Sequence, residues 1–288
     1  MSTTSFARVG IVGSGIMGTG IAEVCARSGV EVLLHDIDPA RATGAIDRIA
    51  ASLAKAVDRG KLDTDHAEAA LGRLTPTSAL DDLADRQLVV EAIVEDEAAK
   101  LAVFAELDRL LDDEALLVSN TSSIPIMKLA MATDRRDRVA GLHFFNPVPV
   151  LSLVELIPSL LTSEETADRL RAFATEQLDK HVILSHDRAG FIVNALLIPY
   201  LLAAIRMLES GFASAEDIDA GMMRGANHPM GPLALADLIG LDTTKAVAES
   251  MYEEFKEPLY APPPLLQRMV DAGLLGRKAG RGFLTYPR

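Results

Sequence analysis

The stretch VGIVGSGIMGTGIAEVCARSG, residues 9–29, decides the fold that we expect for this chain. Its glycines have the G-x-G-x-x-G spacing, which by itself is common by chance in glycine-rich turns. Here an apolar, strand-like run precedes the glycines and a helical pattern follows them. In that context the spacing predicts the strand, tight turn and helix that hold the pyrophosphate of a dinucleotide.

The glycines of this turn have distinct physical tasks in such a site. Gly13 permits the tight turn, Gly15 lets the backbone approach a pyrophosphate, and Gly18 lets the helix pack closely on the strand. The first turn of the helix offers N–H groups and a partial positive charge to the phosphates. The residues expected at the phosphates are Gly13, Gly15, Ile16, Met17 and Gly18.

A second apolar run, residues 31–37, carries Asp36 near its end. A carboxylate at that point accepts a hydrogen bond from the adenosine ribose 2′-hydroxyl and repels a 2′-phosphate. We therefore expect NAD rather than NADP as the cofactor. The alternative is that Asp36 serves only as a turn residue in the segment DIDP.

Composition narrows the remaining classes of function. With 28 Lys and Arg against 41 Asp and Glu, the formal net charge of -13 argues against general binding of nucleic acid or anionic membranes. The single cysteine, Cys25, excludes an internal disulfide framework, and no cysteine or histidine spacing predicts a metal site. Five histidines are interpreted as structural or surface residues: His35, His66, His181, His186 and His228.

The start of the chain and its longest apolar run bear on localisation. A strand pattern begins almost at once after MSTTSF, which leaves no room for a targeting segment. The longest apolar run, residues 194–205, contains Pro199 and is shorter than the roughly 20 residues that span a bilayer. We expect a cytoplasmic protein without membrane contact.

The alternation of strand-like and helical runs predicts an α/β fold. We expect a Rossmann-type, mostly parallel sheet followed by a smaller all-helical C-terminal domain. The pattern changes near Asp187, so the NAD-binding domain is placed at residues 1–187 and the helical domain at 188–288. The first helix of the second domain, residues 191–211, is too apolar for a solvated helix. It is expected to pack on the first domain or on a second copy of the chain.

The elements of the first domain follow from the same patterns. In the last of its helices, Thr162 and Glu165 have the spacing of a capping box. The predicted strands cover 8–13, 31–37, 87–93, 115–120, 138–145, 153–158 and 181–185. The predicted helices cover 16–28, 41–59, 97–111 and 162–179.

Polar side chains follow three of the predicted strands. They are Glu91 and Glu95 at the carboxyl end of one strand, Asn120 to Ser123 at that of a second, and His143 with Asn146 at that of a third. Ligands bind beyond the carboxyl ends of strands in open α/β sheets, so these groups are expected to converge on one edge. A histidine in an apolar strand is either a core residue or a proton-transfer group delivered to a cleft.

These motifs together resemble one enzyme family, the L-3-hydroxyacyl-CoA dehydrogenases. The similarity is greatest to its short, monofunctional bacterial members, the 3-hydroxybutyryl-CoA dehydrogenases, and it covers nearly the whole chain in the family's order. The motifs are GSGIMGTGIA, EAIVED, SNTSS, GLHFFNPVPV, LVELIP, GFIVNALLIPY, HPMGP, GLDTT and GRKAGRGF.

The resemblance implies catalytic roles for four residues. His143 would remove the proton of a substrate 3-hydroxyl while a hydride passes to nicotinamide, a task suited to imidazole because its reference pKa lies near neutrality. Glu155 would orient that imidazole, unless it is only a strand-edge charge. Ser122 would hydrogen-bond the substrate oxygen and the cofactor, or else cap a helix near Ile124. Asn194 matches a family asparagine, although a bond to neighbouring backbone would equally explain it.

The resemblance also implies binding residues. Those matching NAD contacts in relatives are Glu95, Lys100, Ser122, Asn146 and Lys278, although the two lysines could instead be solvated surface charges. Ser52 and Arg59 match the region that binds the coenzyme A nucleotide, with Lys55 and Lys61 nearby. An ordinary polar helix face with Asp58 interleaved is the alternative there. Arg59 also departs from the family's pattern, since it stands where relatives commonly have a lysine.

The function implied is NAD-dependent interconversion of (S)-3-hydroxyacyl-CoA and 3-oxoacyl-CoA by a homodimer joined through its helical domains. Two alternatives remain at this point. One is a related dehydrogenase for 3-hydroxyadipyl-CoA or a free 3-hydroxy acid. The other is a non-catalytic, crystallin-like NAD-binding protein, against which the presence of both His143 and Glu155 argues.

Overall fold

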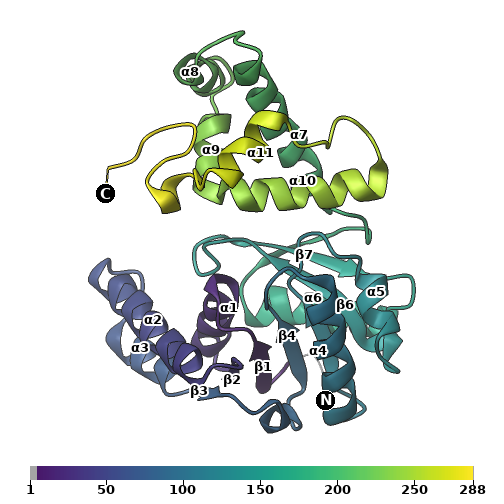
Figure 1. Ribbon diagram of the computed structural model, residues 1–288. Helices are drawn as coiled ribbons and strands as arrows, with labels where there is room; N and C mark the ends of the chain where they lie inside the picture. The colour runs from purple at the N-terminus through teal and green to yellow at the C-terminus, as the bar shows by residue number, and fades with distance from the viewer. Residues whose placement is uncertain (1–4, 288) are drawn as a thin grey trace. The chain divides into compact units, whose positions relative to one another are not determined.

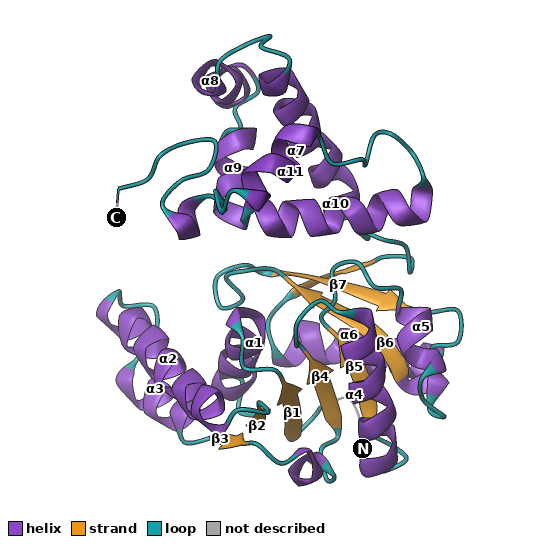
Figure 2. Cartoon of the chain, in the orientation of Figure 1, coloured by secondary structure: helices purple, strands orange, loops and turns teal. Residues whose placement is uncertain are grey.

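The computed structural model describes residues 5–287 of the chain. The chain divides into two compact units, the first ending at Asp187 and the second beginning at Arg188. The first unit combines a sheet with helices, whereas the regular elements of the second unit, among the residues described, are all helical (Figures 1 and 2). The predicted α/β fold class is confirmed.

One eight-stranded sheet organises the first unit (Figure 1). Its strands are β1 (Arg8–Val12), β2 (Glu31–His35), β3 (Leu74–Thr77), β4 (Leu88–Glu91), β5 (Leu116–Ser119), β6 (Val139–Phe144), β7 (Leu153–Pro158) and β8 (His181–Leu184). They lie in the order β3-β2-β1-β4-β5-β6-β7-β8. Strands β1 to β6 are parallel, and β7 pairs antiparallel with β6 and parallel with β8. The chain order reverses between β1 and β4, the point at which open sheets of this kind bind ligands.

Helices cover both faces of this sheet (Figure 1). They are α1 (Ile16–Arg27), α2 (Pro39–Asp58), α3 (Thr64–Leu71), α4 (Glu97–Leu110), α5 (Ile126–Met131) and α6 (Glu164–Ala172), with short turns η1 (Leu80–Leu83), η2 (Arg136–Arg138) and η3 (Phe173–Gln177). Alternate strand residues such as Ile11 and Val90 form one core with apolar residues of α1, α2, α3 and α6. On the opposite face, Gly141 of β6 lies against Ile126 of α5. This alternation assigns each strand side chain to one face.

Two elements of the first unit were not anticipated, and one predicted cap is wrong. Helix α3 and strand β3 escaped prediction because both are short and their apolar residues are few and mostly small, and β3 contains Pro76. The N-cap of α6 is Ser163 rather than Thr162, since the Ser163 hydroxyl accepts from Thr166 N at 3.1 Å. The Thr162 hydroxyl instead donates to the carbonyl of Val139 at 2.6 Å, so it is not available to the helix.

The second unit packs its helices around an apolar core of its own. They are α7 (Val193–Glu209), α8 (Ala215–Gly225), α9 (Pro232–Ile239), α10 (Leu241–Phe255) and α11 (Pro264–Asp271), with the short turn η4 (Arg277–Ala279). The core contains Leu201 and Ile205 of α7, Leu233 of α9 and Met251 of α10. Pro199 lies inside α7 without ending it.

Two buried aspartates hold the backbone of the second unit. Asp219 of α8 accepts from the N–H groups of Leu233 and Ala234 at 2.8 and 2.9 Å and so caps the start of α9. Asp237 of α9 accepts from the backbone of residues 283 and 284, both at 2.9 Å, and from the Tyr286 hydroxyl at 3.0 Å. Burial, together with the Asp237 charge, raises the pKa of Tyr286 to about 12. The C-terminal segment is thereby tied to α9.

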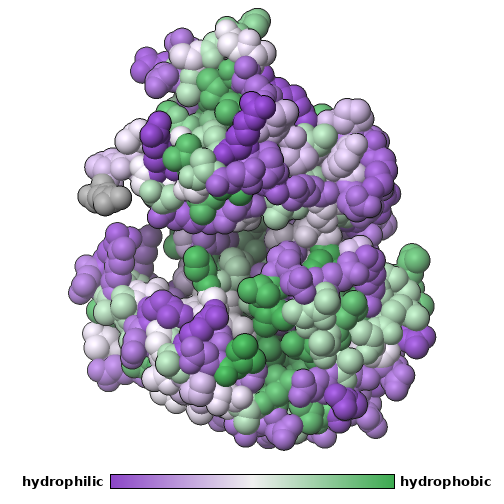
Figure 3. Space-filling model, viewed as in Figure 1, coloured by the Kyte–Doolittle hydropathy of each residue, from purple (hydrophilic) through white to green (hydrophobic). Residues whose placement is uncertain are grey.

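Within residues 5–287 no helix is both long enough and apolar enough to cross a membrane. Large apolar side chains nevertheless reach the surface of the second unit, including Leu196 of α7 at 74% exposed and Phe212 at 79%. Hydrophobic residues are visible among the hydrophilic ones on the face shown in Figure 3.

Candidate active site

The glycine turn between β1 and α1 has the shape that a pyrophosphate requires. Gly13 has a φ of +106°, and an added Cβ would lie 2.5 Å from the carbonyl oxygen of Ala92. A Cβ on Gly18 would lie 1.8 Å from the carbonyl oxygen of Gly13, so only glycine allows this packing. A Cβ on Gly15 would meet nothing within 4 Å, and no described side chain caps the helix there. The residues present therefore fit NAD phosphates at the helix N-terminus.

Asp36 follows β2 and is tied to this turn. Its Oδ2 accepts from the Ser14 hydroxyl at 2.6 Å and from Ser14 N at 3.1 Å, while Oδ1 accepts from Asp38 N at 3.2 Å. Burial alone would raise the pKa of Asp36, but the bonds from Ser14 and Asp38 and the nearby Arg41 guanidinium outweigh it and hold the pKa below its usual value. Asp36 thus forms a local turn bond and also carries a fixed negative charge beside the glycine turn.

His143 and Glu155 are partners across the antiparallel strands β6 and β7. Their Cα atoms are directly opposite in the ladder, and both side chains point to the same face of the sheet. His143 Nδ1 lies 2.7 Å from Glu155 Oε2, and both side chains are buried. The carboxylate accepts the Nδ1 proton of the neutral ring, which leaves Nε2 as an acceptor. The predicted contact between these two residues is present.

Ser122 completes a row of three polar side chains. Its Oγ lies 3.0 Å from His143 Nε2. The predicted alternative for Ser122 is wrong, because α5 begins at Ile126 with Pro125 as its N-cap. The N-terminal amides of α5 instead donate to the carboxylate of Asp187 at 2.7 Å, a contact that the sequence did not indicate.

The backbone around Ser122 separates this row from a hydrolase triad. Ser122 N donates to Glu95, and the N–H groups of Ser123 and Ile124 both donate to the Thr121 hydroxyl. Acyl transfer to a serine requires N–H donors aimed at the developing oxyanion, and these three are already engaged. The arrangement therefore favours proton transfer at His143 over nucleophilic attack by Ser122.

A charge cluster, buried at Glu91 and Lys100 and exposed at Glu95, supports the turn that carries Ser122. Glu95 Oε1 accepts from Thr121 Oγ1 at 2.5 Å and Ser122 N at 3.0 Å, and its Oε2 lies 3.3 Å from Lys100 Nζ. Lys100 is 1% exposed and donates to Glu91 Oε1 at 2.6 Å. The surface-charge alternative for Lys100 is therefore wrong. Burial would raise the pKa of Glu95, but the Lys100 ammonium and the bonds from the serine and threonine residues hold it below its usual value.

Comparisons with known proteins agree with this geometry. The description "3-hydroxyacyl-CoA dehydrogenase, NAD binding domain" matches residues 8–188, and "3-hydroxyacyl-CoA dehydrogenase, C-terminal domain" matches residues 190–286. The chain belongs to the 3-hydroxyacyl-CoA dehydrogenase family. It is an NAD-dependent oxidoreductase, as predicted.

Relatives in this family cover the whole length of the chain. The 3-hydroxybutyryl-CoA dehydrogenase of Mycobacterium tuberculosis is 60% identical over 97% of this chain and 98% of its own. The human mitochondrial hydroxyacyl-coenzyme A dehydrogenase is 42% identical over 96% of this chain and 90% of its own. The crystal structure of (S)-3-hydroxybutyryl-CoA dehydrogenase from Ralstonia eutropha has a TM-score of 0.93 at 45% identity, covering 99% of this chain and 100% of that one.

The remaining residues that the family resemblance assigned to NAD, Asn146 and Lys278, and to catalysis, Asn194, lie at several points of the chain. Asn146 is exposed in the segment directly after β6. Two other candidates belong to the second unit, which is described separately. Asn194 lies half-buried in the first turn of α7, and Lys278 Nζ donates to both carboxylate oxygens of Asp242 at 2.6 and 2.7 Å. Lys278 is therefore a paired rather than a simply solvated charge.

The residues that the resemblance assigned to coenzyme A lie on α2 and just beyond its end. Ser52 is half-buried and lies close to the carboxyl of Glu23 on α1. Burial raises the pKa of that carboxyl overall, although the nearness of Ser52 lowers it. Arg59 directly follows α2 and is exposed, as are Lys55 and Lys61, so these cations can meet phosphates from solvent. The structure thus gives Ser52 an internal partner and leaves Arg59 accessible.

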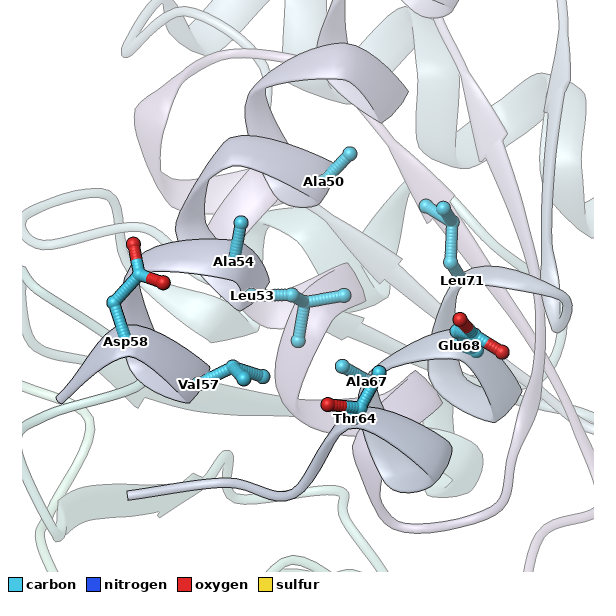
Figure 4. A pocket seen from close by; sticks show the side chains of 9 residues that line it. All are labelled: Ala50, Leu53, Ala54, Val57, Asp58, Thr64, Ala67, Glu68 and Leu71. Atoms are coloured by element: carbon cyan, nitrogen blue, oxygen red, sulfur yellow. The ribbon is translucent and has the colours of Figure 1, made fainter. Parts of the chain in front are cut away.

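A pocket of about 280 Å³ lies between α2 and α3 (Figure 4). Its walls are mainly apolar, with Leu53 and Val57 of α2 facing Ala67 and Leu71 of α3. No lysine or arginine lines it. Such a pocket is unsuited to phosphate groups, so the cations at the end of α2 and this pocket are separate features.

Proposed function

We propose that this protein interconverts (S)-3-hydroxybutyryl-CoA and acetoacetyl-CoA, with His143 as the general acid and base. The observation that carries the proposal is the row Ser122–His143–Glu155, with separations of 3.0 and 2.7 Å. The names of relatives at 60% and 45% identity support the same substrate. The same row argues against a purely cofactor-binding role, because a buried imidazole–carboxylate pair beside a serine hydroxyl is an arrangement suited to reversible proton transfer.

The proton chemistry follows from the partners of His143. When bound, NAD accepts or donates a hydride at C4 of its nicotinamide ring. In the oxidation direction His143 Nε2 removes the proton of the substrate 3-hydroxyl, and in reduction it returns that proton. Glu155 fixes the tautomer through Nδ1 and stabilises the imidazolium that forms. The Ser122 hydroxyl, which is hydrogen-bonded to Nε2 in this structure, turns to donate to the substrate oxygen.

The cofactor and substrate residues complete the proposal. The glycine turn at residues 13–18 and Asp36 bind the pyrophosphate and adenosine ribose of NAD, and Glu95, Lys100, Asn146 and Lys278 contribute to the same cofactor. Arg59 and Ser52 contribute to coenzyme A binding, and Asn194 contributes to the substrate cleft. The exposed apolar side chains of the second unit support a homodimer formed through the helical units. We further infer that the enzyme acts in the cytoplasm.

One assay tests the substrate. NADH oxidation is followed with acetoacetyl-CoA, with longer 3-oxoacyl-CoAs, with 3-oxoadipyl-CoA and with free 3-oxo acids. The highest kcat/KM is expected with acetoacetyl-CoA. A higher value with 3-oxoadipyl-CoA or with free acids would transfer the protein to the corresponding dehydrogenase class, and no oxidation with any substrate would favour a cofactor-binding protein.

The His143→Gln variant tests the proton-transfer role. Its kcat with acetoacetyl-CoA is expected to fall by roughly 10²–10⁴-fold, because general acid–base catalysis contributes a factor of that size. Its melting temperature and NADH affinity should stay close to those of the unchanged protein. A kcat near the original value would remove His143 from the mechanism.

A further inference from the structure

Glu91, the last residue of β4, has no role in the function proposed above, yet its carboxylate is fully buried and makes three strong contacts. Its exposed fraction is 0%, and its Oε1 accepts from Lys100 Nζ at 2.6 Å and from Ile93 N at 2.7 Å. Its Oε2 accepts from Ser119 Oγ at 2.6 Å. An ionised group costs much free energy to bury, so its retention inside the protein requires an explanation beyond packing.

The first of these contacts directs a positive charge at the site. Glu91 holds Lys100, and the same ammonium lies 3.3 Å from Glu95 Oε2. Glu95 in turn accepts from Ser122 N, and Ser122 Oγ lies next to His143 Nε2. A continuous series of polar contacts therefore leads from Glu91 to the imidazole.

The second and third contacts fix backbone on both sides of the site. The bond to Ile93 N orders the segment directly after β4. Gly13 packs closely against this segment, since a Cβ added to Gly13 would lie 2.5 Å from Ala92 O. The Ser119 hydroxyl, held by Glu91, accepts from Thr121 N at 3.1 Å at the start of the turn that carries Ser122. One carboxylate thus orders both the segment after β4, which packs against the glycine turn, and the turn that carries Ser122.

We propose that Glu91 is a positioning residue for the cofactor side of the active site, acting through Lys100, Ile93 and Ser119 rather than by touching a ligand. It aligns residues 92–95 against the glycine turn and directs the Lys100 ammonium at Glu95, which then holds Ser122. Loss of its charge is expected to weaken cofactor binding and to misplace Ser122 and His143 for proton transfer.

The test compares Glu91→Gln with a matched control on the same helix. Asp108 and Lys100 both belong to α4, and Asp108 forms a partly buried ion pair with Arg135 at 2.7 Å, at the other end of the helix from Lys100. NADH affinity is measured by fluorescence titration of the full-length protein. Glu91→Gln should raise the NADH dissociation constant by about 10-fold, as expected when hydrogen bonds to a charged group are lost. Asp108→Asn should change it by less than about 2-fold.

The double variant Glu91→Gln/Lys100→Met removes the buried charges together and guards against loss of folding in the single variant. Its melting temperature should recover relative to Glu91→Gln, because no buried charge is left unpaired. Its NADH affinity should remain weakened, because Glu95 no longer has its ammonium partner. Recovery of NADH affinity in the double variant, or equal weakening in Asp108→Asn, would overturn the proposal.

The turnover number gives a second readout, and this arm rests on the proposed function. Measured per NADH-binding site with acetoacetyl-CoA, kcat should fall by about 10-fold in Glu91→Gln and stay within about 2-fold in Asp108→Asn. An unchanged kcat per site in Glu91→Gln would contradict the link to Ser122. If the unchanged protein fails to use acetoacetyl-CoA, the proposed substrate is wrong, and the NADH titration still decides the role of Glu91.

Discussion

Buried carboxylates occur in both units of the molecule, but their partners differ. In the first unit Glu91 and Glu155 have side-chain partners at the candidate site, namely Lys100, Ser119 and His143, and Glu91 also accepts from Ile93 N. In the second unit the donors to Asp219 and Asp237 are mainly backbone N–H groups, together with the Tyr286 hydroxyl. An ammonium or imidazole partner can carry a charge that the carboxylate balances, whereas backbone N–H partners fix the course of the chain.

This difference separates residues that serve chemistry from residues that serve architecture. Removal of a carboxylate charge in the first unit should change catalysis or cofactor binding more than stability. Removal in the second unit should do the reverse. Four experiments test that contrast.

The largest effect is expected for Glu155→Gln. An amide in place of the carboxylate no longer fixes the tautomer of His143 or stabilises its protonated form, so kcat should fall by about 10²-fold or more. The measurement is steady-state NADH oxidation with acetoacetyl-CoA, with NADH titration to count the functional sites. If the number of NADH-binding sites fell in proportion to the rate of NADH oxidation, Glu155 would support only the fold.

The next effect is expected for Asp36→Ala, which removes the acceptor for the ribose 2′-hydroxyl. The NADH dissociation constant should rise about 10-fold or more, and the preference for NADH over NADPH should narrow. Asp38→Ala is the matched control, because Asp38 is the N-cap of α2 and accepts from Ala40 N. An unchanged cofactor preference in Asp36→Ala, or an equal change in Asp38→Ala, would remove Asp36 from the cofactor site.

The third experiment changes the second unit. The side-chain amide of Asp219→Asn has only one oxygen that can accept a hydrogen bond, so one of the two N–H donors at the start of α9 would face an N–H group instead. The free energy of unfolding should therefore fall by about 1–3 kcal/mol. Urea unfolding of the variant measures this loss. Below the unfolding transition its kcat per NADH-binding site should match that of the unchanged protein. A reduced kcat with unchanged stability would contradict the architectural role.

The smallest effect concerns how the stability of the protein depends on acid pH. The pKa of Glu95 in the folded protein lies below its usual value, which is about 4.3 in the unfolded chain. Between these two pKa values the unfolded chain binds more protons than the folded protein, so acid favours unfolding there. The contribution of Glu95 to stability is therefore present above that range and lost below it. Urea midpoints measured from neutral to acid pH should decline less steeply for Glu95→Gln. Parallel curves for the two proteins would show that Glu95 is not held as an anion.

Much of the fold could be predicted because its signals are local. The glycine spacing, the apolar runs of the parallel strands and the polar residues at their ends all lie within short windows of sequence. Strand β3 and helix α3 were missed because they are short and hold few large apolar residues, so periodicity gave no signal. The Thr162 cap failed for a different reason, since the Val139 carbonyl that takes its hydroxyl is distant in sequence.

The candidate site shows the same division. His143 and Ser122 could be selected from their positions at strand ends and from the resemblance, and Glu155 from the resemblance alone; the structure brings these three together. Glu91 was noted at a strand end, but its task depends on Lys100 and Ser119, which reach it only after folding. The Asp187 carboxylate on the amides of α5 is likewise a long-range contact that no short window contains.

The pairing of β6 with β7 has a consequence for how this molecule can be altered. His143 and Glu155 occupy a single rung of the ladder, and side chains alternate between faces along each strand. A deletion or insertion of one residue in either strand would send one of the two to the opposite side and separate them. Changes of specificity are therefore more readily reached by replacing the residues around this rung than by shifting the strands that form it.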